Sequence, residues 1–152
     1  MLMTEKQITI CELVEETLDY YWGHPERFGR NQNDGCVYRT CDGQYCAVGR
    51  CIDWGRLDMD MKWRIADFDA DVASLHEEVD IHVQVKYRYS GIGVDYWDSL
   101  QCLHDRSYHW DDSANLTPEG YKYMRLAFSD FDIDYYLSSR GYKIPKEEKE
   151  QE

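Results

Sequence analysis

No stretch of this 152-residue sequence comes near the roughly 18 consecutive apolar residues that a membrane-spanning helix requires. The N-terminal segment MLMTEKQITI also lacks the basic region and the apolar region of a secretory signal peptide. We therefore expect a cytoplasmic protein that neither crosses nor enters a membrane. In that reducing compartment, the six cysteines are expected to be free thiols or metal ligands rather than three disulfides.

Basic residues are scarce. Lys and Arg together number 17 against 30 Asp and Glu, which gives a formal net charge of -13. The phosphate backbone of a nucleic acid would be repelled by such a surface, so direct nucleic-acid binding is disfavoured. A surface of this sign suits a basic protein partner, or it serves solubility alone.

Proline is also rare, with three residues, and the sequence has neither an internal repeat nor a linker. Apolar residues make up 43% of the chain, which is ample for one core. We expect residues 1–145 to form a single globular domain. The segment KEEKEQE at 146–152 has no apolar residue to bury and is expected to be a disordered tail.

The pattern of apolar residues predicts an α+β fold that is mainly helical, with a small β element. A capping box at Thr4–Gln7 and apolar residues three and four apart predict a first helix over 5–22. The segment HVQVKYRY at 82–89 alternates apolar and polar residues and predicts a strand.

Four further segments carry helix signals. Apolar spacing predicts helices over 65–78 and 94–105. Thr117 followed by Pro118 is a typical helix start, because Thr caps the first turn and Pro fits its first position. A last helix is predicted over 133–139 and should end at Gly141.

The segment CVYRTCDGQYCAVGRC contains four cysteines, with four residues between each and the next, and SLQCLHD follows about 50 residues later. Together these blocks resemble a family of small uncharacterised phage and bacterial proteins. The shared pattern is Cys, Tyr-Arg, Gly, Cys-Ala-Val/Ile-Gly and a downstream Leu-Gln-x-x-His-Asp, and the chain departs from it at Cys41 and Cys51. The resemblance implies a phage or mobile-element setting and no particular mechanism. The matching positions are Cys36, Tyr38, Arg39, Gly43, Cys46, Ala47, Val48, Gly49, Leu100, Gln101, His104 and Asp105.

Our main functional hypothesis is that the protein binds, and inhibits or modulates, a host or defence protein through a surface of aromatic and acidic side chains. Tyr and Trp are favoured at interfaces because they offer large, rigid contact area with a polar group. Acidic charge would suit a basic partner surface, including a nucleic-acid groove that the protein blocks by mimicking phosphate charge. The candidate binding residues are Tyr96, Trp97, Asp98, Tyr108, Trp110, Asp111 and Asp112. Alternatively, these aromatic side chains belong to the core.

An alternative hypothesis is a hydrolase or transferase with Cys46 as nucleophile. A thiolate can be activated by a nearby imidazole, here His104, and Arg39 could stabilise an anionic intermediate. Asp105 should be a poor partner for His104, because neighbouring residues on a helix point about 100° apart. The competing interpretation is that Cys46–Gly49 is a packing seam of small residues.

A third hypothesis is a zinc-stabilised domain with Cys36, Cys46 and His104 as ligands. Structural zinc sites normally use pairs of cysteines two to four residues apart, so one pair at this spacing would be tolerable, but four cysteines in a row at this spacing are not a standard zinc knuckle. We therefore expect no metal and no other cofactor.

Overall fold

The computed structural model describes residues 6–28, 38, 44–66, 68 and 72–145. These residues form seven α-helices joined by loops and short 3-10 turns. The helices are α1 (Ile10–Tyr21), α2 (Met59–Ala66), α3 (Val72–Val79), α4 (Ile81–Gln84), α5 (Val94–Asp105), α6 (Pro118–Ala127) and α7 (Ile133–Ser139). The 3-10 turns are η1 (Pro25–Arg27), η2 (Gly49–Cys51), η3 (Trp54–Arg56), η4 (Tyr87–Tyr89) and η5 (Ser107–His109).

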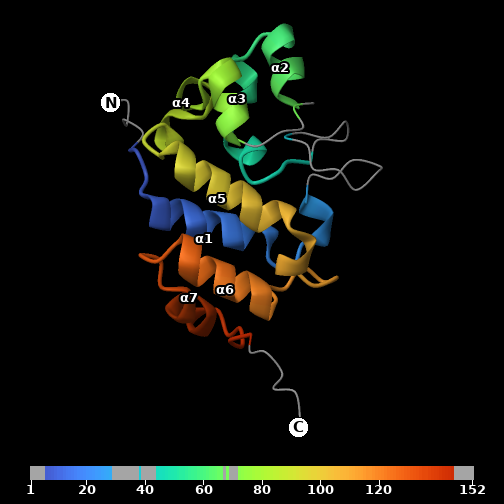
Figure 1. The fold of residues 1–152 in the computed structure, drawn as a ribbon, viewed down its shortest axis with the longest axis vertical. Coiled ribbons are helices and arrows are strands. Elements are labelled where there is room, and N and C mark those ends of the chain that lie inside the picture. The colour runs from blue at the N-terminus through green and yellow to red at the C-terminus, as the bar shows by residue number, and fades with distance from the viewer. Residues whose placement is uncertain (1–5, 29–37, 39–43, 67, 69–71, 146–152) are drawn as a thin grey trace, which may run out of the picture.

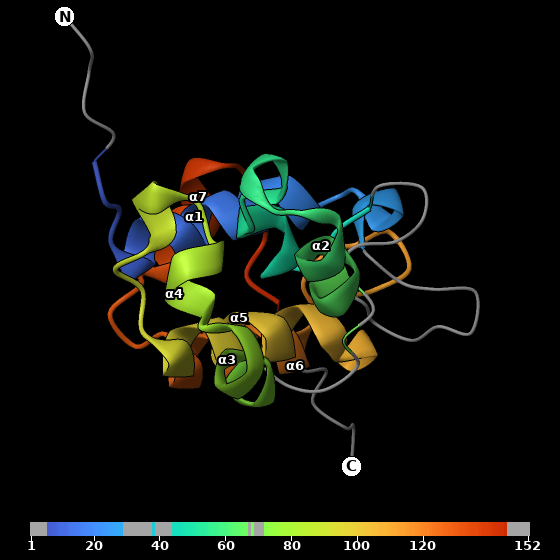
Figure 2. The ribbon, with the colours of Figure 1, turned by 90° about the horizontal axis from the view of Figure 1, so that it is seen from above.

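The helices are stacked along the long axis of the molecule. In Figure 1, α2 and α3 lie at the upper end, α5 and α1 in the middle, and α6 and α7 at the lower end. Helix α5 contacts both α3 and α6, and α6 contacts α7. Figure 2, which looks down on this stack, shows α2 and α4 in front of the central helices. Among the described residues, no helix is both long enough and apolar enough to cross a membrane.

The predicted β element is wrong for the described part of the chain, where the fold is helical. Three isolated bridges are present and no strand, and residues 82–89 form most of α4 and all of η4. Val83 is 55% exposed and Tyr87 60%, whereas Gln84, Val85 and Tyr89 are buried, so alternation does not describe this segment. Only Val85 is paired, in a single antiparallel bridge with Ile52.

The first helix is shorter than predicted, because the cap lies five residues further on. Thr9, not Thr4, caps α1. The Oγ1 of Thr9 accepts the Glu12 amide at 3.3 Å, and Glu12 Oε1 accepts the Thr9 amide at 3.2 Å, which completes a capping box. Just before it, the Ile8 amide donates to the Arg88 carbonyl at 2.9 Å, and Thr9 itself has an extended backbone. Thr4 itself lies outside the described residues.

The later helices follow their local signals more closely. The predictions for α5 and α7 are confirmed at both ends, and α6 starts with Thr117 as N-cap and Pro118 at its first position. Gly141 follows α7 with a φ of 73°, a conformation that favours glycine. The helix predicted over 65–78 is instead parts of two helices, α2 and α3, with residues 67 and 69–71 outside the described part of the chain.

Two carboxylates of α1, Glu16 and Asp19, join this helix to two other parts of the fold. Glu16 accepts hydrogen bonds from Arg88 Nη2 at 2.7 Å and from the Tyr89 hydroxyl at 2.8 Å, which joins α1 to η4. Asp19 Oδ1 accepts from the Tyr136 hydroxyl and from Arg140 Nε, both at 2.7 Å, which joins α1 to the end of α7. Leu13, Val14 and Leu18 of the same helix are fully buried in the core between these contacts.

We predict that Thr9→Ala lowers the free energy of unfolding by about 1 kcal/mol, because it removes the reciprocal cap of α1. Urea denaturation followed by circular dichroism would measure the change. Thr4→Ala is the matched control and should leave stability nearly unchanged. Equal destabilisation by both variants would contradict the cap that the structure assigns to Thr9.

Candidate functional site

The described parts of the two sequence blocks that carry the family resemblance meet in the core. Cys46, Ala47 and Val48 have no exposed surface, and Gly49 is buried with them. Gln101, in the C-terminal half of α5, hydrogen-bonds the Cys46 thiol, and Asp105 at the end of this helix is near enough for its charge to act on the thiol. The Tyr21 hydroxyl of α1 donates to the Tyr45 carbonyl at 2.6 Å, so this short segment touches both central helices.

Gly49 is needed here for a close backbone contact. A Cβ atom added at this position would lie 1.8 Å from the carbonyl oxygen of Tyr38, whose side chain is itself buried. The Gly49 amide donates to Cys46 Sγ at 3.2 Å, which closes the turn. The segment therefore has the properties of a small-residue packing seam. Cys36, Arg39, Cys41 and Gly43 lie outside the described residues.

His104 and Asp105 interact directly, contrary to our expectation from the helical angle between them. His104 Nδ1 lies 2.7 Å from Asp105 Oδ1, and a carboxylate can only accept, so the proton belongs on Nδ1. Gln101 Nε2 donates to Asp105 Oδ2 at 3.0 Å from one turn earlier. Asp105 is the last residue of α5, and this bond from Gln101 holds its carboxylate back over the final turn.

Two aromatic rings that the sequence analysis did not single out enclose the His104 ring. Tyr21 meets it edge-on, with ring centroids 4.8 Å apart, and Phe28 stacks on it at 4.9 Å with an interplanar angle of 21°. Only 1% of His104 is exposed. The position of Tyr21 on the apolar face of the first helix was visible in the sequence, but its contact with a residue 83 positions away was not.

The environment of Cys46 favours the neutral thiol. Complete burial raises the pKa of Cys46 well above its ordinary value and outweighs the hydrogen bond from the Gly49 amide, which lowers it; the charge of Asp105 raises it further. Burial likewise raises the pKa of Cys51 to about 11. A nucleophilic cysteine needs a lowered pKa and access to substrate, and the described geometry offers Cys46 neither.

The described part of the chain contains no group of three His, Cys, Asp or Glu side chains placed to hold a metal ion. Of the three zinc ligands in our third hypothesis, Cys46 and His104 are buried in the core, and Cys36 lies outside the described residues. The zinc hypothesis therefore stays a prediction, because one of its three ligands lies outside the described residues.

The structure divides the predicted binding residues between core and surface. Trp97 is fully buried, and Trp110 is buried with its Nε1 donating to the Leu103 carbonyl at 2.9 Å. Both indoles are therefore packing residues in the described fold. Tyr96 and Tyr108 are exposed, at 39% and 57%.

The exposed members of this set form two groups rather than one patch. Tyr96 and Asp98 lie near the start of α5, whereas Tyr108, Asp111 and Asp112 lie just beyond its end. A 12-residue helix is about 18 Å long, so the helix separates the two groups. Asp111 also has a local role, because its Oδ1 accepts the amides of Ser113 and Asn115 at 2.9 Å.

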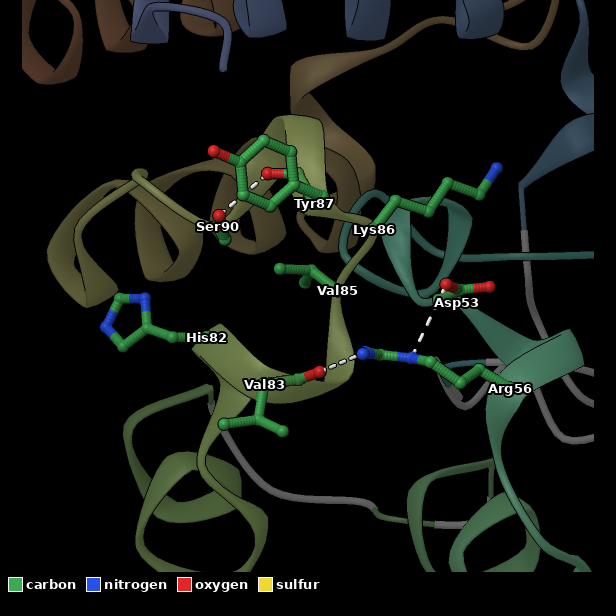
Figure 3. A pocket seen from close by; sticks show the side chains of 8 residues that line it. All are labelled: Asp53, Arg56, His82, Val83, Val85, Lys86, Tyr87 and Ser90. Atoms are coloured by element: carbon green, nitrogen blue, oxygen red, sulfur yellow. Dashed lines mark hydrogen bonds and ion pairs between the residues drawn. The ribbon is translucent and has the colours of Figure 1, made fainter. Parts of the chain in front are cut away.

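A surface hollow of about 380 Å³ lies beside α4 and η4 and faces η3 (Figure 3). Arg56 donates to the Val83 carbonyl, and its Nε lies 3.5 Å from Asp53 Oδ2. In Figure 3, Lys86 is directed away from Arg56, and His82 lies on the far side of Val83. The polar side chains of this hollow therefore bind one another or diverge, and they do not converge on one ligand position. The lining residues are Asp53, Arg56, His82, Val83, Val85, Lys86, Tyr87 and Ser90.

Comparison of the chain with protein-family models, with curated proteins and with solved structures gave no match. The resemblance of the two blocks to the phage and bacterial family therefore stays a prediction. The described residues form a buried cluster around Cys46, Gly49 and His104. The surface outside this cluster belongs to a chain with a net charge of -13.

We predict that Gly49→Ala lowers the free energy of unfolding by at least about 2 kcal/mol, because the new methyl group overlaps the Tyr38 carbonyl and backbone must move. Gly55→Ala is the matched control, since a Cβ there meets nothing within 4 Å. Chemical denaturation of both variants would test the contact. Equal stability of Gly49→Ala and wild type would refute it.

Thiol reactivity separates the packing role of Cys46 from the catalytic one. We predict that iodoacetamide at pH 8 modifies the half-buried Cys11 and Cys102 before Cys46 and Cys51, because burial both hides the latter thiols and raises their pKa values. Peptide mapping by mass spectrometry at timed intervals would give the order. Rapid alkylation of Cys46 that is lost in His104→Ala would instead support the enzyme hypothesis.

Proposed function

We propose that this protein binds a basic surface of a host or defence protein in the cytoplasm and inhibits or modulates it, as an accessory protein of a phage or mobile element. The observation that carries the proposal is a set of exposed carboxylates that form no ion pair within the described residues, next to exposed tyrosines. The phage setting rests on the resemblance of the two sequence blocks, and the binding role rests on charge.

Part of the positive charge in the chain is paired internally. Five arginines form ion pairs with acids of the same chain, so these cations add little to the outward field. The pairs are Arg50 and Arg88 with Glu16, Arg56 with Asp53, Arg64 with Glu78, and Arg140 with Glu15 and Asp19.

The acids around α5 differ in this respect. Asp95, Asp98 and Asp112 are exposed, and none of them forms an ion pair within the described part of the chain. Exposed Tyr96 lies between the first two, and exposed Tyr108 lies near the third. Carboxylates in this setting attract a basic surface from a distance, and the tyrosines offer contact area once it arrives.

The partner that fits this charge best is a protein groove that itself binds nucleic acid. Such a groove is lined with Lys and Arg placed to neutralise phosphates, and carboxylates carry charge of the same sign as phosphates. A protein with a net charge of -13 would therefore compete with nucleic acid for the groove rather than bind nucleic acid itself. The buried thiol gives the cysteine-nucleophile alternative no comparable support.

We predict that a partner captured from lysate on the immobilised protein is released as salt rises and is displaced by duplex DNA, because both weaken contacts between carboxylates and Lys or Arg. Retention that neither salt nor DNA changes would contradict charge mimicry.

Two variants of equal net charge test where on the surface the charge acts. Asp98→Lys with Asp112→Lys should slow association severalfold, since both exposed acids are reversed. Replacement of the tail acids Glu147, Glu148, Glu150 and Glu152 by Gln changes the net charge by the same amount and should leave the association rate near that of the wild type. Association kinetics by surface plasmon resonance would compare them, and equal rates for the two variants would contradict a role for the acids around α5.

A further inference from the structure

Helix α2 carries apolar side chains on two opposite faces, and only one of these faces is covered. Ile65 is fully buried, and Met61 is half-buried on the same side. Trp63 lies two residues before Ile65, which places it about 200° away around the helix. It therefore points outward, together with Met59 one turn earlier.

The outward face exposes a large apolar area. Met59 is 64% exposed and Trp63 is 61% exposed. Trp22, Trp97 and Trp110 are buried, so Trp63 is an exception within its own chain. Figure 1 shows α2 at the upper end of the molecule, away from α6 and α7. A tryptophan and a methionine one turn apart on an exposed helix are typical of an anchor for another protein.

The sequence around α2 is acidic. Between Asp58 and Asp80 the sequence contains eight acidic residues and two basic ones, so this short segment carries six of the 13 surplus negative charges of the chain. One of the two cations, Arg64, has its Nη2 3.7 Å from Glu78 Oε2 and is already paired. Asp58 and Asp60 directly flank Met59.

This charge decides between the possible occupants. A second copy of the chain would bring like charges together around the two tryptophans, which opposes self-association. A partner segment with Lys or Arg beside an apolar side chain would gain both apolar burial and charge neutralisation. The face of an indole ring also attracts Lys and Arg cations directly.

We propose that the outward face of α2, formed by Met59 and Trp63, is the docking surface for a basic amphipathic segment of the partner protein. An apolar side chain of the segment packs on Met59 and Trp63, and its flanking cations meet Asp58 and Asp60. The inference rests on the proposed function and adds a second contact with the basic partner, on α2, to the acids and tyrosines around α5.

The test uses a synthetic amphipathic helix with leucines along one face and lysines elsewhere, so it needs no cellular partner. The protein is labelled with 5-fluorotryptophan, and the Trp63 resonance is assigned from a Trp63→Phe variant. We expect the peptide to shift the Trp63 resonance in fluorine NMR. Trp63→Ala and Met59→Lys should each weaken peptide binding roughly tenfold or more in a calorimetric titration.

Three controls make the result specific. Tyr135→Ala removes an aromatic ring that is 70% exposed on α7, at the other end of the molecule, and should leave affinity unchanged. The same peptide with glutamates in place of lysines should not bind. Thermal melting of Trp63→Ala should match that of wild type, since little of this side chain is buried.

The proposal would be overturned if both Trp63→Ala and Met59→Lys bound the peptide with unchanged affinity, or if the glutamate peptide bound as tightly as the lysine peptide. It would also be overturned if sedimentation velocity showed a dimer that Trp63→Ala abolishes. The last result would make a second copy of the chain the occupant. Failure of the intact protein to capture any salt-sensitive partner would count against the proposed function alone, because the peptide titration reports on the α2 surface independently.

Discussion

Burial of the short segment Cys46–Gly49 against α1 and α5 fixes the central helices of this protein against one another. In the described part of the chain no sheet supplies long-range backbone pairing, so side-chain and loop contacts must do this work. The backbone at Gly49 lies close to the Tyr38 carbonyl, the Tyr45 carbonyl accepts from Tyr21 of α1, and Gln101 of α5 hydrogen-bonds the Cys46 thiol. Packing alone can therefore account for the motif residues that the structure describes.

The burial of the motif residues bears on whether they can act as catalytic groups. A histidine bonded to a carboxylate near a cysteine has the composition of a catalytic site, yet Tyr21 and Phe28 enclose the His104 ring and the thiol is held neutral by burial. Catalysis needs groups that a substrate can reach. What the molecule presents to solvent is uncompensated carboxylates and a few exposed aromatic and apolar side chains, a combination suited to binding a basic protein.

Some local signals predicted local structure correctly, but the alternation at 82–89 wrongly predicted a strand, and none of them predicted tertiary contacts. Helices α5 and α7 and the start of α6 follow from caps and periodicity within their own segments. Thr4 and Thr9 are each followed three residues later by Gln or Glu, so the capping-box pattern alone could not choose between them. The helix starts at the second site, next to a hydrogen bond from Ile8 to the distant Arg88. Residue type likewise cannot tell a buried Trp97 from an exposed Trp63, because both suit a core and an interface equally.

The central claim is that the motif residues hold the fold while the surface meets the partner. Hydrogen–deuterium exchange of the protein, alone and bound to a partner captured through a salt-sensitive contact, tests it most directly. The account predicts that binding slows exchange in α2 and leaves exchange unchanged in residues 46–49 and 101–105. Slower exchange confined to those two segments, with α2 unaffected, would contradict it.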